Sequence, residues 1–94
     1  MESVDDLVAR TDAPIETSVE FFDARELPPP KPLQETLERL VEVTDSTVFV
    51  QLNDRAPQFL YPKLDDRGYT YETFSIPEGD VTVIWSMETE NDTG

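Results

Sequence analysis

The chain has 94 residues and a formal net charge of −14, from 21 acidic and 7 basic residues. This length allows one small domain with a modest core and leaves no room for a deep catalytic cleft. The charge argues against nucleic-acid backbones and anionic membranes as partners, because both attract clustered lysines and arginines.

The sequence contains neither cysteine nor histidine. This excludes disulfides, zinc–thiolate sites and thiol catalysis, and it removes the commonest general base and metal ligand. Carboxylate pairs such as Asp65–Asp66 are expected in so acidic a chain, and no calcium-loop spacing is present. We therefore expect no enzyme, no cofactor and no metal site. No apolar run is long enough to span a bilayer and no secretory segment follows Met1, so we expect a cytoplasmic protein.

Lysine is rare among the basic residues, since only Lys31 and Lys63 are lysines. A large carboxylate excess with few lysines resembles the proteins of halophiles that accumulate salt. High salt screens the self-repulsion that would otherwise destabilise a compact acidic chain. An ordinary acidic protein from a low-salt organism is the alternative.

Residues 1–17 are interpreted as an acidic extension ahead of the domain. Ser3, three residues before Asp6 and just before Leu7 and Val8, has the spacing of a capped helical turn. A frayed terminus explains the same residues, and we favour that interpretation. At the other end, residues 88–94 are interpreted as an acidic tail.

The segment from residue 18 to residue 43 is predicted to form a strand, a turn and a helix. Residues 18–24 are rich in β-branched and aromatic side chains, which favour a strand. Three consecutive prolines follow, and a helix can begin at them because its first turn has free N–H groups anyway. The helix is expected over 30–43. Its apolar stripe consists of Leu33, Leu37, Leu40 and Val41.

The second half of the chain is predicted to add three strands and one helix. Thr47–Leu52 is a strand that places Phe49 opposite Val48 and Val50. A helix over 55–67 is expected to begin at Asn53–Asp54, to kink at Pro62 or divide there into two short pieces, and to end at Gly68. The last two strands, Tyr69–Ser75 and Val81–Met87, should form a hairpin through residues 77–80.

These elements follow the order β-α-β-α-β-β, which indicates a mixed α/β (α+β) domain. We expect two layers, because two helices cannot cover both faces of so small a sheet. The first two strands should be parallel, since a helix connects them, and the last two antiparallel.

The segment FDARELPPPKPL resembles the strand, turn and helix of the TusA/SirA-like sulfur-carrier superfamily. There, a Cys-Pro-x-Pro run opens the helix. Here Pro29 stands at the position of the sulfur-carrying cysteine, Pro30 and Pro32 match the two prolines, and Glu26 replaces a glycine. The chain is most similar to a cysteine-less, uncharacterised branch of that superfamily. The motifs of that branch correspond to Leu27–Leu33 and Asn53–Leu60.

The resemblance implies a TusA-like two-layer domain over residues 18–87, a mixed four-stranded sheet with both helices on one face. It also implies a non-catalytic binding or regulatory module, an accessory in redox, metal-centre or respiratory metabolism that contacts an unknown protein partner. A degenerate sulfur-relay protein is one alternative. A nucleic-acid-binding module is another, and the net charge disfavours it.

Two surfaces are candidate binding sites. The turns after the two parallel strands should lie near each other, and helix N-termini favour anions. The first site is therefore Pro29, Pro30, Asn53, Asp54 and Arg55. The alternative is that Asn53 and Asp54 only cap a helix and the prolines only set a turn.

The second candidate is an aromatic surface on the sheet face away from the helices, formed by Phe49, Tyr69 and Tyr71. A cluster of exposed aromatic side chains would suit protein binding or dimerisation. The alternative is that the N-terminal residues fold over this face.

Overall fold

The computed structural model describes residues 3–14, 18–43 and 46–86. Its elements, in chain order, are α1 Val4–Ala9, β1 Ser18–Asp23, α2 Lys31–Glu42, β2 Thr47–Asn53, α3 Leu60–Asp66, β3 Tyr69–Ile76 and β4 Gly79–Ser86. The predicted order of strands and helices from residue 18 onward is confirmed. Met87 and the acidic tail over 88–94 lie outside the described residues. None of the described helices has the length and apolar character that crossing a membrane requires.

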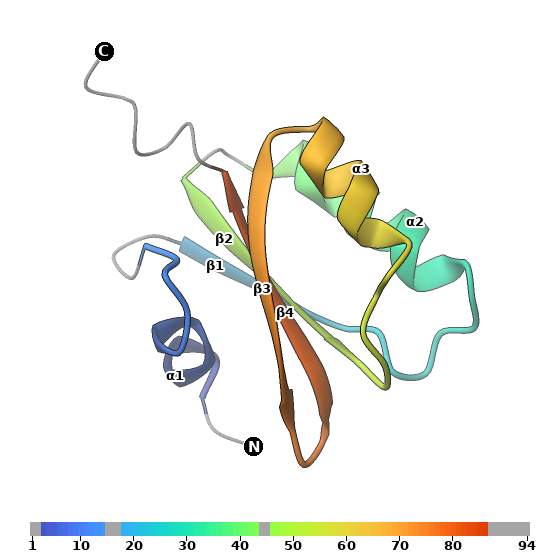
Figure 1. Cartoon of the computed structure of the whole chain (residues 1–94), viewed down its shortest axis with the longest axis horizontal. Helices are drawn as coiled ribbons and strands as arrows, with labels where there is room; N and C mark the ends of the chain where they lie inside the picture. Colours follow the sequence, from blue (N-terminus) through green and yellow to red (C-terminus); the bar gives the residue numbers. More distant parts are fainter. Residues whose placement is uncertain (1–2, 15–17, 44–45, 87–94) are drawn as a thin grey trace.

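The four strands form one mixed sheet in the order β1-β2-β4-β3. β1 and β2 are parallel, with Val19 opposite Val48, as a helical connection requires. β4 pairs antiparallel with both β2 and β3. α2 and α3 lie next to each other on one side of the sheet, and α1 lies on the other side (Figure 1). The predicted sheet with two helices on one face is therefore confirmed, and a third helix is added to it.

The N-terminal residues form a helix, so the favoured frayed terminus is wrong for this part of the chain. The Ser3 side-chain oxygen accepts a hydrogen bond from the Asp6 N–H at 3.1 Å, which caps the helix. Leu7 and Val8 are only 0% and 2% exposed. The free energy gained by burying these two side chains outweighs the poor intrinsic stability of so short a helix.

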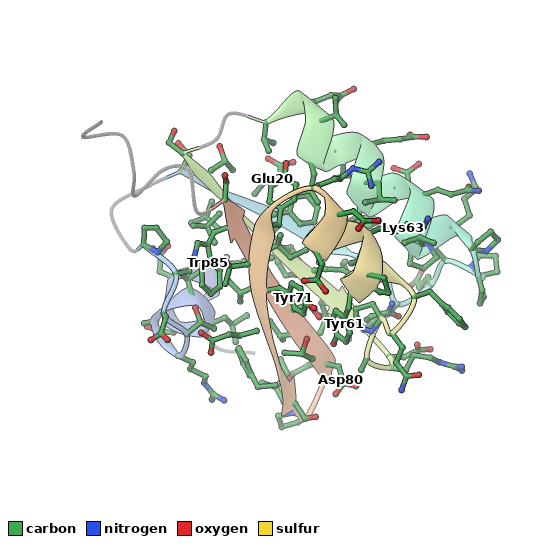
Figure 2. The ribbon with its side chains drawn as sticks, turned by 45° about the horizontal axis from the view of Figure 1, so that its top comes forward. Glu20, Tyr61, Lys63, Tyr71, Asp80 and Trp85 are labelled. Atoms are coloured by element: carbon green, nitrogen blue, oxygen red, sulfur yellow. The ribbon has the colours of Figure 1, made fainter. Side chains whose placement is uncertain are left out.

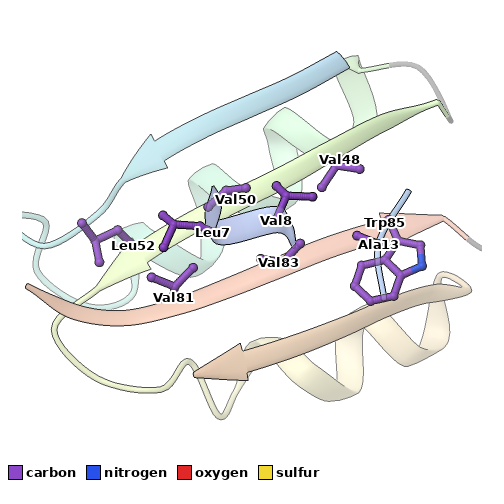
Figure 3. Close-up of a cluster of buried hydrophobic side chains, with 9 residues drawn as sticks. All are labelled: Leu7, Val8, Ala13, Val48, Val50, Leu52, Val81, Val83 and Trp85. Atoms are coloured by element: carbon purple, nitrogen blue, oxygen red, sulfur yellow. The ribbon is translucent and has the colours of Figure 1, made fainter. Parts of the chain in front are cut away.

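α1 closes an apolar core on its side of the sheet, which we call the α1-side core (Figure 3). Along each strand, the side chains that enter this core alternate with side chains that face α2 and α3. Its buried members are Leu7, Val8, Ala13, Val48, Val50, Leu52, Val81, Val83 and Trp85. Figure 2 shows Trp85 on this side.

The opposite face packs under α2 and α3, and we call its core the helix-pair core. Its buried apolar members are Phe22, Ala24, Leu40, Phe49, Leu60, Leu64 and Ile84. Tyr69 and Tyr71 pack against it and are half-buried. The prediction of an exposed aromatic surface is therefore wrong. Phe49, Tyr69 and Tyr71 do share one face, but that face lies under the helices and Phe49 is fully buried.

Two details of the predicted helices also differ from expectation. Val41 is 76% exposed, while Thr36 is buried and takes its place in the helix stripe. Thr36 lies one turn from Leu33 and Leu40 on the same face of α2, whereas Val41 is rotated away from the middle of the stripe.

α3 is shorter than the helix expected over 55–67. Pro57 restricts Ala56 to extended backbone, so the chain cannot turn helical until later. Asn53 and Asp54 therefore do not cap the helix, which begins at Leu60. Pro62 falls in the first helical turn, where its missing N–H costs nothing, so the expected kink is absent.

Candidate functional site

The turns that precede α2 and α3 enclose an open groove of about 930 Å³, which we call the proline groove. Most of its lining is apolar and much of that is proline. The apolar lining residues are Leu27, Pro29, Pro30, Pro32, Leu33, Ala56, Pro57, Phe59, Leu60 and Pro62. The polar and charged lining residues are Asn53, Asp54, Arg55, Gln58, Lys63 and Asp66.

All five residues of the first predicted site line this groove: Pro29, Pro30, Asn53, Asp54 and Arg55. The parallel pairing of β1 and β2 explains this, because both chains leave the sheet at the same edge. The prediction that the two turns lie together is therefore confirmed. Binding by these residues remains a prediction.

The groove is poorly suited to anions, because its two helix starts have few free N–H groups. At the start of α2, the Lys31 N–H donates to the Pro28 carbonyl at 2.9 Å and Pro32 has no N–H at all. At the start of α3, the Leu60 N–H donates to the Pro57 carbonyl at 2.9 Å, and Pro62 has none. The start of α2 therefore leaves an anion at most one N–H and the start of α3 at most two, where a helix usually leaves four.

The charges inside the groove cancel. Two basic residues, Arg55 and Lys63, face two acidic ones, Asp54 and Asp66. Arg55 pairs weakly with Asp54, at 3.9 Å between Nε and Oδ1, and the Arg55 side chain is 81% exposed. The groove is therefore a formally neutral, apolar patch on a chain whose net charge is −14.

Phe59 is the most conspicuous side chain of the groove, at 84% exposure. It precedes α3 and its backbone is already helical, with no side-chain cap. In the described part of the chain, only Phe59 and Val41 are large hydrophobic residues that are exposed. Val41 lies on α2 outside the groove lining, so the two residues form a natural pair for comparison.

Contacts between α3 and β3 hold the Phe59 side of the groove in place. The rings of Tyr61 and Tyr71 stack with their centroids 4.7 Å apart (Figure 2). The Tyr61 hydroxyl lies 2.6 Å from the Thr73 hydroxyl, and the Tyr71 hydroxyl donates to Asp65 Oδ2 at 3.3 Å. Desolvation raises the pKa of Tyr71, and the charge of Asp65 adds to this effect. Tyr71 is protonated at neutral pH with or without this shift and donates the hydrogen bond there.

The sheet floor beneath the helices becomes polar toward the groove. In register order, the row after Phe49 and Ile84 contains three polar residues beside Phe22 of β1, namely Gln51, Thr82 and Thr73. Gln51 is fully buried and its Nε2 donates to the Thr36 hydroxyl of α2 at 2.8 Å. The Gln51 side-chain carbonyl has no protein partner. The helix-pair core is therefore held partly by polar contacts, unlike the core under α1.

A second, smaller cavity of about 440 Å³ lies on the other side of Leu27, and we call it the charged hollow. Its other lining residues are Phe22, Asp23, Glu26, Lys31, Glu35 and Arg39. Arg39 covers the Phe22 ring at 4.3 Å and approaches Glu35 and Glu20 at 3.6 and 3.8 Å. The Arg25 side chain donates to Asp23 at 2.8 Å, and this hydrogen bond holds the pKa of Asp23 below its usual value.

Sequence reasoning missed Phe59, Lys63 and Asp66 as groove residues. It placed Phe59 inside a helix, where an apolar side chain next to Leu60 would be expected to pack. The signal that could have corrected this was Pro57, because a helix that starts after it leaves Phe59 outside. In the described ranges, no three carboxylates converge in a way that could hold a metal ion.

A family of uncharacterised conserved proteins, designated DUF2249, matches residues 21–85 of the chain. The matched region spans β1 to β4 and contains both turns of the proline groove. No curated protein and no solved structure matches the chain.

Proposed function

We propose that this chain, a member of the uncharacterised DUF2249 family, binds a protein partner at the proline groove. In this proposal it is a small non-catalytic binding or regulatory module. The observation that carries the proposal is the exposed Phe59, held in an apolar and formally neutral groove of an otherwise acidic chain.

The groove has properties of a protein-docking surface rather than of a catalytic cleft. Exposed apolar patches bordered by polar residues are typical of interaction sites, and aromatic side chains are enriched in their cores. Phe59 and Arg55 both project into solvent, so the walls do not enclose a ligand. The sequence offers neither cysteine nor histidine for chemistry.

The wider role rests on the resemblance to sulfur carriers. By that resemblance, the module is an accessory in redox, metal-centre or respiratory metabolism, and we propose that it works in the cytoplasm. Pro29 occupies the position of the sulfur-carrying cysteine, and a persulfide requires a thiol. We therefore favour docking over the alternative of a degenerate sulfur-relay protein. Incubation with a cysteine desulfurase and labelled cysteine should leave the chain unlabelled, and stable transfer of label would reverse this preference.

A crosslinking experiment tests the docking proposal. A photoreactive amino acid is placed at position 59 in one variant and at position 41 in another, and both are irradiated in cells. Both positions are exposed and apolar, so non-specific capture should be equal. We expect a discrete partner adduct from position 59 and none from position 41. Equal adducts from both positions, or none from either, would contradict docking at the groove.

A further inference from the structure

We infer that the occupant of the proline groove is a partner segment that combines an apolar anchor with neighbouring lysine or arginine residues. This inference rests on the proposed function and specifies the chemistry of the partner. It follows from the contrast between the neutral groove and the charges around it.

The groove supplies apolar contact without a charge preference of its own. Its walls are mainly proline and leucine with the exposed Phe59, and its two basic and two acidic residues cancel. An apolar anchor can therefore bury surface there without leaving a charge unpaired.

The surroundings, in contrast, are acidic. Beyond the groove, the exposed side of α2 carries Glu38 and Glu42, and the end of α3 carries Asp65. The charged hollow, which shares Leu27 with the groove, adds Asp23, Glu26 and Glu35 against two basic residues. Along these surfaces a partner segment meets more carboxylates than basic groups: Asp23, Glu26, Glu35, Glu38, Glu42 and Asp65 against Arg25, Lys31, Arg39 and Arg67. Basic residues beside the anchor would be attracted, and acidic ones would be repelled.

A displayed library of short random peptides tests this inference. The library is selected on the intact chain, and bound sequences are counted after selection. Parallel selections use two variants, Phe59→Ser and Val41→Ser, which remove highly exposed apolar side chains inside and outside the groove. We expect enriched peptides to pair an apolar residue with lysine or arginine. Their affinity should fall at least about tenfold for Phe59→Ser and stay unchanged for Val41→Ser.

The role of the surrounding charges is tested with a matched pair of double variants. Glu26→Gln with Glu35→Gln removes two carboxylates of the charged hollow, which shares Leu27 with the groove, and Asp5→Asn with Asp6→Asn removes two on the opposite side of the sheet. For an enriched basic peptide, the first pair should weaken binding by about twofold to tenfold, and added salt should reduce this difference. The second pair should have no measurable effect.

The possible failures are distinguishable. Enrichment of neutral or acidic peptides that still depends on Phe59 would overturn the inference and leave the proposed function standing. Enrichment of purely basic peptides that do not depend on Phe59 would indicate simple charge attraction and overturn the inference. A Phe59-dependent dimer in sedimentation velocity would make a second copy the occupant. No Phe59-dependent binding of any kind would sink the proposed function as well.

Discussion

The two faces of the sheet are built differently, and the difference separates folding from function. On the α1 side, β2 and β4 contribute only apolar side chains to the core. On the helix-pair side, the same two strands contribute Gln51, Asn53, Thr82 and Ser86 to the buried surface beside Phe49 and Ile84. The first face is closed by a six-residue helix. The second ends in an open groove, where apolar residues remain exposed.

Mutations on the two faces should therefore have different effects, one on stability and the other on binding. An apolar core stabilises in proportion to the apolar area that it buries. An exposed apolar groove adds little to stability, because its side chains remain in contact with water. Changes on the α1 side should therefore alter unfolding, and changes in the groove should alter partner binding.

The largest effect is expected from the α1 side. Leu7→Ala should lower the free energy of unfolding by about 2–5 kcal/mol, because Leu7 is fully buried in the α1-side core. Urea unfolding followed by circular dichroism measures this change. Val41→Ala on α2 serves as the control and should shift it by less than about 0.5 kcal/mol. A negligible effect of Leu7→Ala would mean that α1 does not belong to the core.

A smaller effect is expected from the polar contact on the other face. Thr36→Val should cost about 1–3 kcal/mol, because it leaves the buried Gln51 amide without its hydrogen-bond partner. The double variant Thr36→Val with Gln51→Met removes both polar groups and should regain much of that loss. Equal stability of the single and double variants would show that the loss does not come from an unpaired Gln51 amide.

Salt should stabilise the chain if its acidic surface is an adaptation to high salt. Screening reduces the repulsion among carboxylates that accompanies a net charge of −14. The melting temperature should therefore rise with KCl from low to multimolar concentration. Differential scanning calorimetry at several KCl concentrations checks this, and a flat profile would count against halophilic adaptation.

The smallest effect concerns the edge of the charged hollow. The hydrogen bond from Arg25 lowers the pKa of Asp23 in the folded state, so ionised Asp23 stabilises folding above its ordinary value of 3.8. That contribution is lost as the pH falls through the lowered folded pKa. Because both side chains are about 40% exposed, it should be at most about 1 kcal/mol.

The measurement compares the unfolding free energies of the native chain and Asp23→Asn from neutral pH downward. The native chain should be slightly more stable above pH 3.8, and the difference should disappear in stronger acid. A difference that persists or grows on acidification would contradict the assigned cause.

Much of the fold could be predicted because its signals are local. The alternation of side chains along a strand predicted that Phe49 lies on the face opposite to Val48, and the prolines indicated where α2 begins. Alternation does not, however, say which face a helix will cover. α1 and the helix pair both bury apolar side chains, so the face of Phe49 was assigned to the wrong side.

The groove could be predicted only in part. Parallel pairing brings the two turns together, and this follows from chain order alone. The exposure of Phe59 depends on the residue at which α3 begins, and this boundary is decided by the backbone between Ala56 and Leu60. The buried pair of Thr36 and Gln51 depends on how α2 lies across β2, which no local pattern specifies.

The most direct test of the division between the two faces is a map of amide chemical shifts. The isotope-labelled chain is titrated with a peptide or partner that binds it, and perturbed amides are placed on the structure. We expect the largest shifts from Leu27 to Leu33 and from Asn53 to Lys63, with α1 unaffected. Largest shifts in α1, or along the outer edge of β1 or β3, would contradict this division.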